Sequence, residues 1–212
     1  MTLARIYQII SNKYLLFLDL ILMFVLLFNP SKFLSVQHYQ LRILLYLSIL
    51  PYLAFNLYFS RFTKIQLGLT PIINRNGIKF SLISVIFLAV VFTITRTLFP
   101  ELFNFNNTPS SIIDVLIRIF YYAVISAPIQ ELIFRSYLIT RLEQFTTNKY
   151  LLILISSLIF SIVHWPFGSF ILSAGSFVLG IFLADNFLRY RSLGLVTLMH
   201  FMIGVLLVPF TL

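Results

Sequence analysis

The sequence has no cysteine and few charged residues, and both absences narrow what this protein can be. Without cysteine there is no disulfide, no thiol nucleophile and no Cys-ligated metal. Charged residues make up 10% of the chain and hydrophobic residues 60%, whereas a soluble domain has about 25% charged and about 45–50% apolar residues. The Gly-x-Ser-x-Gly motif of many serine hydrolases is also absent. The composition therefore indicates an integral membrane protein.

Long apolar windows recur along the whole chain, each near the length of about 20 residues that a helix needs to cross the hydrocarbon core. We therefore expect an all-α polytopic transmembrane helix bundle of about seven spans, with a range of six to eight. We treat the whole chain, 1–212, as a single membrane domain. The fourth window is about 45 Å long as a helix, so it should tilt, kink near Pro128 or protrude. The windows are 14–29, 41–59, 79–99, 112–141, 150–165, 168–186 and 193–211.

The net charge of +9 comes from Lys and Arg residues that lie near the ends of the apolar windows. Such a distribution fits anionic lipid headgroups and topology determinants rather than a nucleic-acid-binding face, so we expect a bilayer and no nucleic acid as partner. The basic residues concentrate in alternate connections, which places the N-terminus in the cytoplasm. The segment 60–78 is then a cytoplasmic loop or an interfacial helix. The abundance of Phe, Ile and Asn is typical of a prokaryotic source, and so favours a prokaryotic cell membrane.

Glu131 and Arg135 lie inside an apolar stretch, where ionisable groups cost several kcal/mol and are functional candidates by default. They are spaced i, i+4, so on a helix they share a face and can pair. A purely structural ion pair that holds two helices together is the alternative interpretation. Gln130 is offset from Glu131 by about 100° around a helix, so the two side chains cannot both point straight at one centre, although a wide cavity could take both.

Two of the three histidines accompany the same pattern of apolar spans. His164 ends the window 150–165 beside Trp165, which also fits an interfacial polar residue because tryptophan favours the headgroup level. His200 stands near the middle of the last window, with no polar residue closer than Thr197. A buried imidazole needs a hydrogen-bond partner, and this one should come from another helix.

These residues occur in an order that resembles the CPBP family, the CAAX protease and bacteriocin-processing (Abi) intramembrane peptidases. The family motifs are Glu-Glu-x-x-x-Arg, Phe-x-x-x-His and His-x-x-x-Asn, each on a different helix. The corresponding residues here are Gln130-Glu131-Leu132-Ile133-Phe134-Arg135, Phe160-Ser161-Ile162-Val163-His164 and His200-Phe201-Met202-Ile203-Gly204. The resemblance covers a catalytic core of about 112–212 and leaves 1–111 as variable N-terminal spans.

The resemblance implies an intramembrane endopeptidase whose catalytic residues are Glu131, His164, His200, Arg135 and Gln130. It is compatible with a water activated by a glutamate alone, with no cofactor. It is equally compatible with a divalent metal such as zinc, for which His164, His200 and Glu131 are the candidate ligands. Two positions depart from the motifs: Gln130 replaces a glutamate taken as the water-activating base, and Gly204 replaces an asparagine taken to stabilise the oxyanion.

The predicted function is hydrolysis of a peptide bond in a peptide or membrane-protein substrate by a Glu/His-activated water. The two departures favour an alternative, a catalytically inactive CPBP-like scaffold or immunity protein that binds membrane partners. A small-solute transporter, in which Glu131, Arg135 and His200 line a path, predicts repeated halves. The sequence contains no such repeat.

Overall fold

A computed structural model describes residues 51–55, 58, 62–69, 74–103, 111–165 and 169–206. These residues form helices, turns and loops, with no strand among them. The predicted windows 14–29 and, except for its last part, 41–59 lie outside the described residues. The other five windows correspond to α5 (Arg75–Leu98), a long helix (Ile112–Leu142), α9 (Lys149–His164), α10 (Phe170–Tyr190) and α11 (Leu193–Gly204).

The helices begin where a short polar side chain can satisfy the first backbone N–H groups. Five side chains cap helix N-termini in this way: Asn74, Ser111, Asn148, Ser169 and Ser192. Such caps stabilise a helix by about 1 kcal/mol each. They explain why the helices start at the polar ends of the apolar windows.

Among the described residues, three helices are long and apolar enough to cross a membrane: α5, the long helix Ile112–Leu142 and α10. The helices α9 and α11 are apolar but shorter, with 16 and 12 residues. Large hydrophobic side chains such as Ile83, Ile86, Ile113 and Phe120 are more than half exposed, which in water would be costly but in lipid is favourable. The prediction of an all-α integral membrane bundle is confirmed for the described part of the chain.

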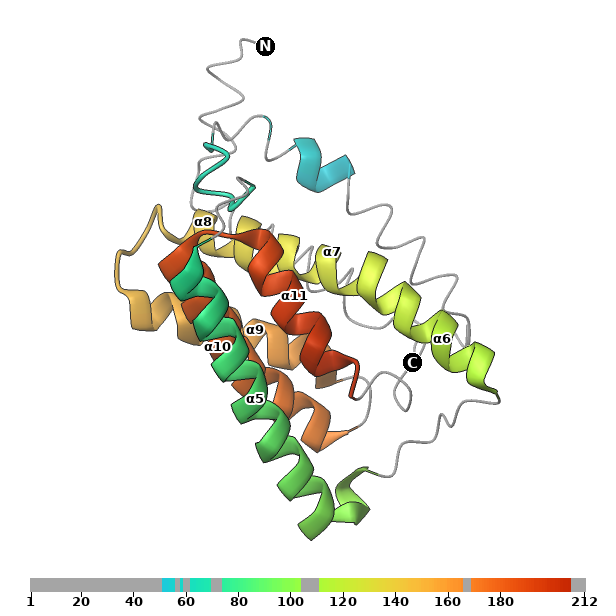
Figure 1. Cartoon of the computed structure of the whole chain (residues 1–212). Coiled ribbons are helices and arrows are strands. Elements are labelled where there is room, and N and C mark those ends of the chain that lie inside the picture. Colours follow the sequence, from blue (N-terminus) through green and yellow to red (C-terminus); the bar gives the residue numbers. More distant parts are fainter. Residues whose placement is uncertain are drawn as a thin grey trace.

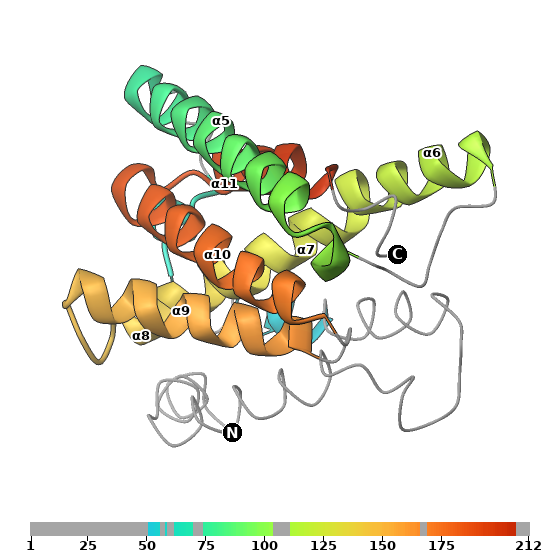
Figure 2. The ribbon, with the colours of Figure 1, turned by 90° about the horizontal axis from the view of Figure 1, so that it is seen from below.

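The helices pack along and across one another (Figures 1 and 2), and clusters of buried hydrophobic side chains lie between them. The neighbours α9 and α10 pack along each other, and α11 contacts α5, α10 and α7. The long helix runs across the others in Figure 1, so that its central part lies against α11. A buried hydrogen bond from Asn186 Nδ2 to Ser81 Oγ, 2.7 Å long, joins α10 to α5. This arrangement brings the central turns of the long helix, α9, α10 and α11 together.

The long helix departs from α geometry at two π-helical turns. It is made of α6 (Ile112–Tyr121), η2 (Tyr122–Ser126), α7 (Ala127–Glu131), η3 (Leu132–Tyr137) and α8 (Leu138–Leu142). The Ala127 N–H donates to Tyr122 O, five residues back. Pro128 has no N–H and its ring crowds the carbonyl four residues before it, which relaxes the preceding turn. The irregularity expected near Pro128 therefore takes the form of π turns on both sides of α7.

A described part of the segment 60–78, residues 62–69, folds as a turn that packs against the bundle. Ser136 Oγ donates to Leu67 O at 2.7 Å, and the Leu193 N–H donates to Gly68 O at 2.9 Å. Gly68 has φ +67°, a conformation that favours glycine. Leu67 is 4% exposed. The turn is thus tied to both the long helix and the start of α11.

Candidate active site

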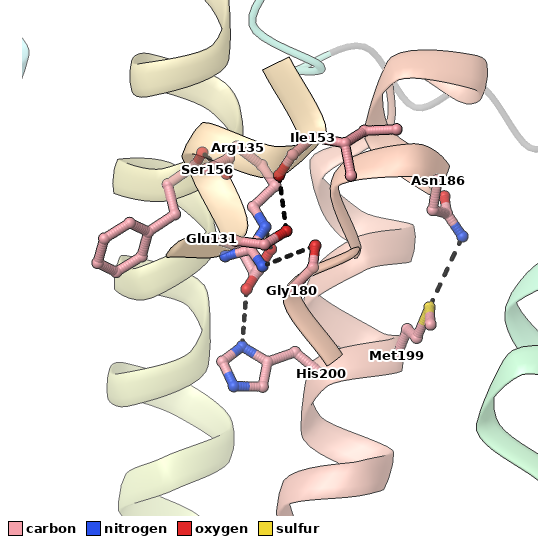
Figure 3. A network of polar contacts seen from close by, with 10 residues as sticks. Glu131, Arg135, Ile153, Ser156, Gly180, Asn186, Met199 and His200 are labelled. Atoms are coloured by element: carbon pink, nitrogen blue, oxygen red, sulfur yellow. Dashed lines mark hydrogen bonds and ion pairs between the residues drawn. The ribbon is translucent and has the colours of Figure 1, made fainter. Parts of the chain in front are cut away.

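A buried ion pair lies at the centre of the long helix. Glu131 is the last residue of α7, and Arg135 lies one turn later in η3. Arg135 Nε is 3.2 Å from Glu131 Oε2, and both side chains are 0% exposed (Figure 3). The pairing expected from the i, i+4 spacing is therefore present. Because both charges are removed from solvent, each depends on the other and on nearby dipoles.

His200 reaches the same carboxylate from α11. Its Nδ1 is 2.8 Å from Glu131 Oε1, and its side chain is 3% exposed. The partner thus comes from another helix, as the apolar surroundings of His200 in the sequence predict. A carboxylate oxygen can only accept a hydrogen bond, so this contact favours the proton on Nδ1 and leaves Nε2 for another group.

The two contacts to Glu131 are short, but neither has the angles of a hydrogen bond. The three groups are close to one another, and the opposite charges of Glu131 and Arg135 attract. Both oxygens of Glu131 consequently have no directed hydrogen bond from the residues that the structure describes. A buried carboxylate of this kind retains lone pairs for a further donor, such as a water or a substrate N–H.

Arg135 is held on its other sides by a backbone carbonyl and an aromatic ring. Its Nη2 donates to Gly180 O on α10 over 3.5 Å. Its Cζ lies 4.4 Å from the centre of the Phe160 ring, a cation–π distance. A Cβ on Gly180 would lie only 3.0 Å from Ser157 Cα, so glycine lets α10 approach α9 closely at this level. The two helices thereby enclose the guanidinium.

The Phe160 ring links the two imidazoles. Its centre is 4.7 Å from that of His164 and 5.4 Å from that of His200, and both pairs are edge-to-face. His164 Nδ1 is 2.7 Å from Phe160 O, one turn back on α9. A carbonyl oxygen accepts, so Nδ1 donates and Nε2 is the nitrogen that carries the acceptor lone pair. The motif contains Phe160, but its spacing does not reveal that the ring touches both histidines and Arg135.

Gln130 forms its hydrogen bond within its own helix rather than with the ion pair. Its Nε2 donates to Ser126 Oγ at 2.8 Å. Its Oε1 is buried and has no partner among the described residues. Gln130 therefore lies beside Glu131 in the chain and offers an unused acceptor, but it does not share the contacts of the carboxylate.

The candidate metal ligands do not form a metal centre in this arrangement. The oxygens of Glu131 contact Arg135 and His200, and His164 Nδ1 contacts a carbonyl. In the described part of the chain, no group of three or more His, Cys, Asp or Glu side chains could hold a metal ion. A guanidinium next to the carboxylate also repels a second cation. The described residues do not fit a zinc site, and we derive no step through a metal.

A recess of about 550 Å³ opens between the long helix and α11. Ala123 of the long helix and Phe201 of α11 line it. The rest of its lining comes from the turn at residues 68–69 and from the first half of α11, including Thr197 and Leu198. The recess is mostly apolar, which suits the lipid-facing environment of the helices.

The fold and the site define a class of protein: an α-helical membrane protein in which one helix supplies a buried carboxylate and guanidinium, and other helices bring imidazoles close to them. Residues 112–206 match the family described as Rce1-like, Type II CAAX prenyl endopeptidase Rce1-like. This segment is therefore similar to that family, and the resemblance seen in the three motifs is confirmed. At the level of the family, the match supports an intramembrane CAAX-type endopeptidase. Neither the curated proteins nor the solved structures contain a match to the chain.

Proposed function

We propose that this protein is an intramembrane endopeptidase that hydrolyses a peptide bond with a water activated by Glu131 and His200. The observation that carries the proposal is the 2.8 Å contact between His200 Nδ1 and Glu131 Oε1 in a site closed to solvent. A carboxylate next to an imidazole stabilises, through its charge, the imidazolium that forms during proton transfer.

In the proposed reaction, His200 Nε2 takes a proton from the water while the water oxygen adds to the scissile carbonyl carbon. The tetrahedral oxyanion then collapses and the C–N bond breaks. The imidazolium returns its proton to the leaving amine, so that one water is consumed for each bond cleaved. Glu131 takes no part in the proton transfer of this scheme, and its carboxylate lies next to Arg135 and to the imidazole.

The other candidates have supporting roles in this proposal. Arg135 positions Glu131, and its own position is held by Gly180 O and the Phe160 ring. His164 orients the water through Nε2, since its Nδ1 is engaged by a carbonyl. Gln130 offers its free amide oxygen to a substrate N–H, a role that requires no proton transfer.

The proposed substrate is a peptide or a membrane-protein segment that enters from the lipid bilayer. The description of the matched family names CAAX prenyl endopeptidases, and the residues of this chain do not require a prenyl group. We further propose a prokaryotic cell membrane as its location, a cytoplasmic N-terminus, and one domain whose catalytic core spans about 112–212. The scattered basic residues at helix ends support the orientation.

The test is terminomics on membranes that carry the wild type or Glu131→Gln at matched abundance of inserted protein. We expect new peptide termini with the wild type that disappear in the variant. The matched control is Asp114→Asn, since Asp114 also pairs with an arginine four residues later, Arg118, on the same long helix. Membranes that carry Asp114→Asn should yield the same peptide termini as membranes that carry the wild type. Because Glu131→Gln leaves Arg135 without its carboxylate, the double variant Glu131→Gln/Arg135→Met separates loss of the carboxylate from loss of folding.

Identical termini in all of these membranes, with every variant stably inserted, would overturn the proposed activity. The alternative function would then hold: an inactive relative that keeps the buried ion pair for packing and binds membrane partners. The specific observation in its favour is the complete burial of Glu131 and Arg135, at 0% exposure. Peptide termini that depend on Glu131 would exclude this alternative function.

A further inference from the structure

Gly204 lacks a side chain at the position where the CPBP motif has asparagine. It follows His200 by four residues on α11, so the two positions lie on the same face of the helix. Both are buried. A side chain at position 204 would therefore lie beside the imidazole, where a hydrogen-bond donor could reach an oxyanion. Glycine supplies no such donor.

The side chain of Tyr122 fills this place. A Cβ built on Gly204 would overlap the Tyr122 hydroxyl oxygen and two atoms of its ring. The Tyr122 ring is also edge-to-face with His200, with centroids 5.6 Å apart and planes at 90°. Tyr122 is 8% exposed. Only glycine at position 204 admits the ring, so the two residues are sterically complementary.

The π turn η2 directs Tyr122 toward the site. Glu131 follows Tyr122 by nine positions, which in a uniform α-helix would place the two side chains about 180° apart. The turn η2 begins at Tyr122 and absorbs one extra residue before Glu131, so the angle falls to about 80°. A sequence read with α-helical periodicity alone would therefore assign Tyr122 to the wrong face of the helix.

We propose that the Tyr122 hydroxyl donates the hydrogen bond that stabilises the oxyanion, and so replaces the donor that Gly204 lacks. This role rests on the proposed function. A tyrosine O–H is among the side-chain donors that form oxyanion holes, and Tyr122 lies against the imidazole that handles the proton. Gly204 then has a function: it leaves the space that the tyrosine needs.

The test compares rates at which Glu131-dependent termini appear in the terminomics experiment. Tyr122→Phe removes only the hydroxyl and keeps the ring against His200 and Gly204. Losing one oxyanion donor typically lowers the rate about 100- to 1000-fold, and we expect a loss in this range with unchanged melting of the purified protein. The control Tyr121→Phe makes the same chemical change one position earlier and should leave the rate unchanged.

A residue swap tests whether position 204 and Tyr122 supply the same donor. Gly204→Asn in the presence of Tyr122 should prevent folding, because the new side chain overlaps the ring. In a Tyr122→Ala background the same change has room, and it returns a donor to the site. We expect the double variant Tyr122→Ala/Gly204→Asn to cleave at least about 10-fold faster than Tyr122→Ala alone.

The outcomes separate this proposal from the proposed function. If the wild type cleaves and Tyr122→Phe cleaves at the same rate, the role of Tyr122 is wrong while the activity stands. Equal rates for Tyr122→Ala with and without Gly204→Asn, both folded, would also overturn it. If the wild type yields no Glu131-dependent termini, the proposed function fails first and the role of Tyr122 fails with it.

Discussion

Glu131→Gln should destabilise the protein strongly, because it leaves the Arg135 guanidinium buried without a counter-charge. Both side chains are 0% exposed. In the described part of the chain, Arg135 also contacts Gly180 O and the rings of Phe160 and Phe134, and none of these carries a negative charge. Removing one partner of a buried ion pair costs about 3–5 kcal/mol. Insertion scales give about 2.5–3.5 kcal/mol for a charge at membrane depth. We therefore expect a loss of about 3 kcal/mol in the free energy of unfolding.

The free energy of unfolding can be measured in mixed micelles by raising the fraction of denaturing detergent. Trp165 is the one tryptophan in the sequence, and its fluorescence can follow the transition. The matched control is Arg189→Gln: this arginine also pairs with a carboxylate four residues away, Asp185, but its side chain is 51% exposed. Asp185 keeps a second partner in Lys149. The control should lose less than about 1 kcal/mol.

The double variant Glu131→Gln/Arg135→Met removes both charges and should be close to the wild type in stability, since replacing a whole buried pair is often neutral. A Glu131→Gln variant as stable as Arg189→Gln would refute the reasoning, because Arg135 would not depend on the carboxylate. A double variant as unstable as the single one would also refute it, because the loss would then come from packing rather than from an unpaired charge.

Two further predictions concern residues around the site and can be measured in the same unfolding assay. Phe160→Ala should lower the free energy of unfolding by about 3–5 kcal/mol, because the ring is 0% exposed and packs on both imidazoles and on Arg135. Phe160→Leu keeps most of the side-chain volume and should lower it less. Equal losses for the two variants would contradict a specific role for the ring. Gly68→Ala should lower the free energy of unfolding by about 1–3 kcal/mol, because φ is +67° and a Cβ would lie 2.7 Å from Phe187 Cε2. The control Gly175→Ala should instead raise the free energy of unfolding by about 0.5–1 kcal/mol, because this glycine lies inside a helix and its Cβ would meet nothing within 4 Å.

Several features of the fold could be predicted from local sequence alone. The apolar windows predict the helices closely, since the window 112–141 corresponds to Ile112–Leu142. The i, i+4 spacing of Glu131 and Arg135 predicts their pairing, because a helix fixes the distance between such positions. Other features were not predictable in this way. The π turns depend on how the turns around Pro128 relax and pack, and they change which face each earlier residue occupies.

The sequence by itself determined the class of this protein and most of its candidate residues. Charge is so costly in an apolar span that Glu131, Arg135 and His200 stand out without any structure. Only the tertiary structure decided which of them meet: His200 contacts Glu131, His164 contacts Phe160, and Tyr122 occupies the space beside Gly204. The physical reason is that contacts between separate helices depend on their crossing and rotation. These are set by packing over the whole bundle and by two π turns that no local hydrophobic pattern records.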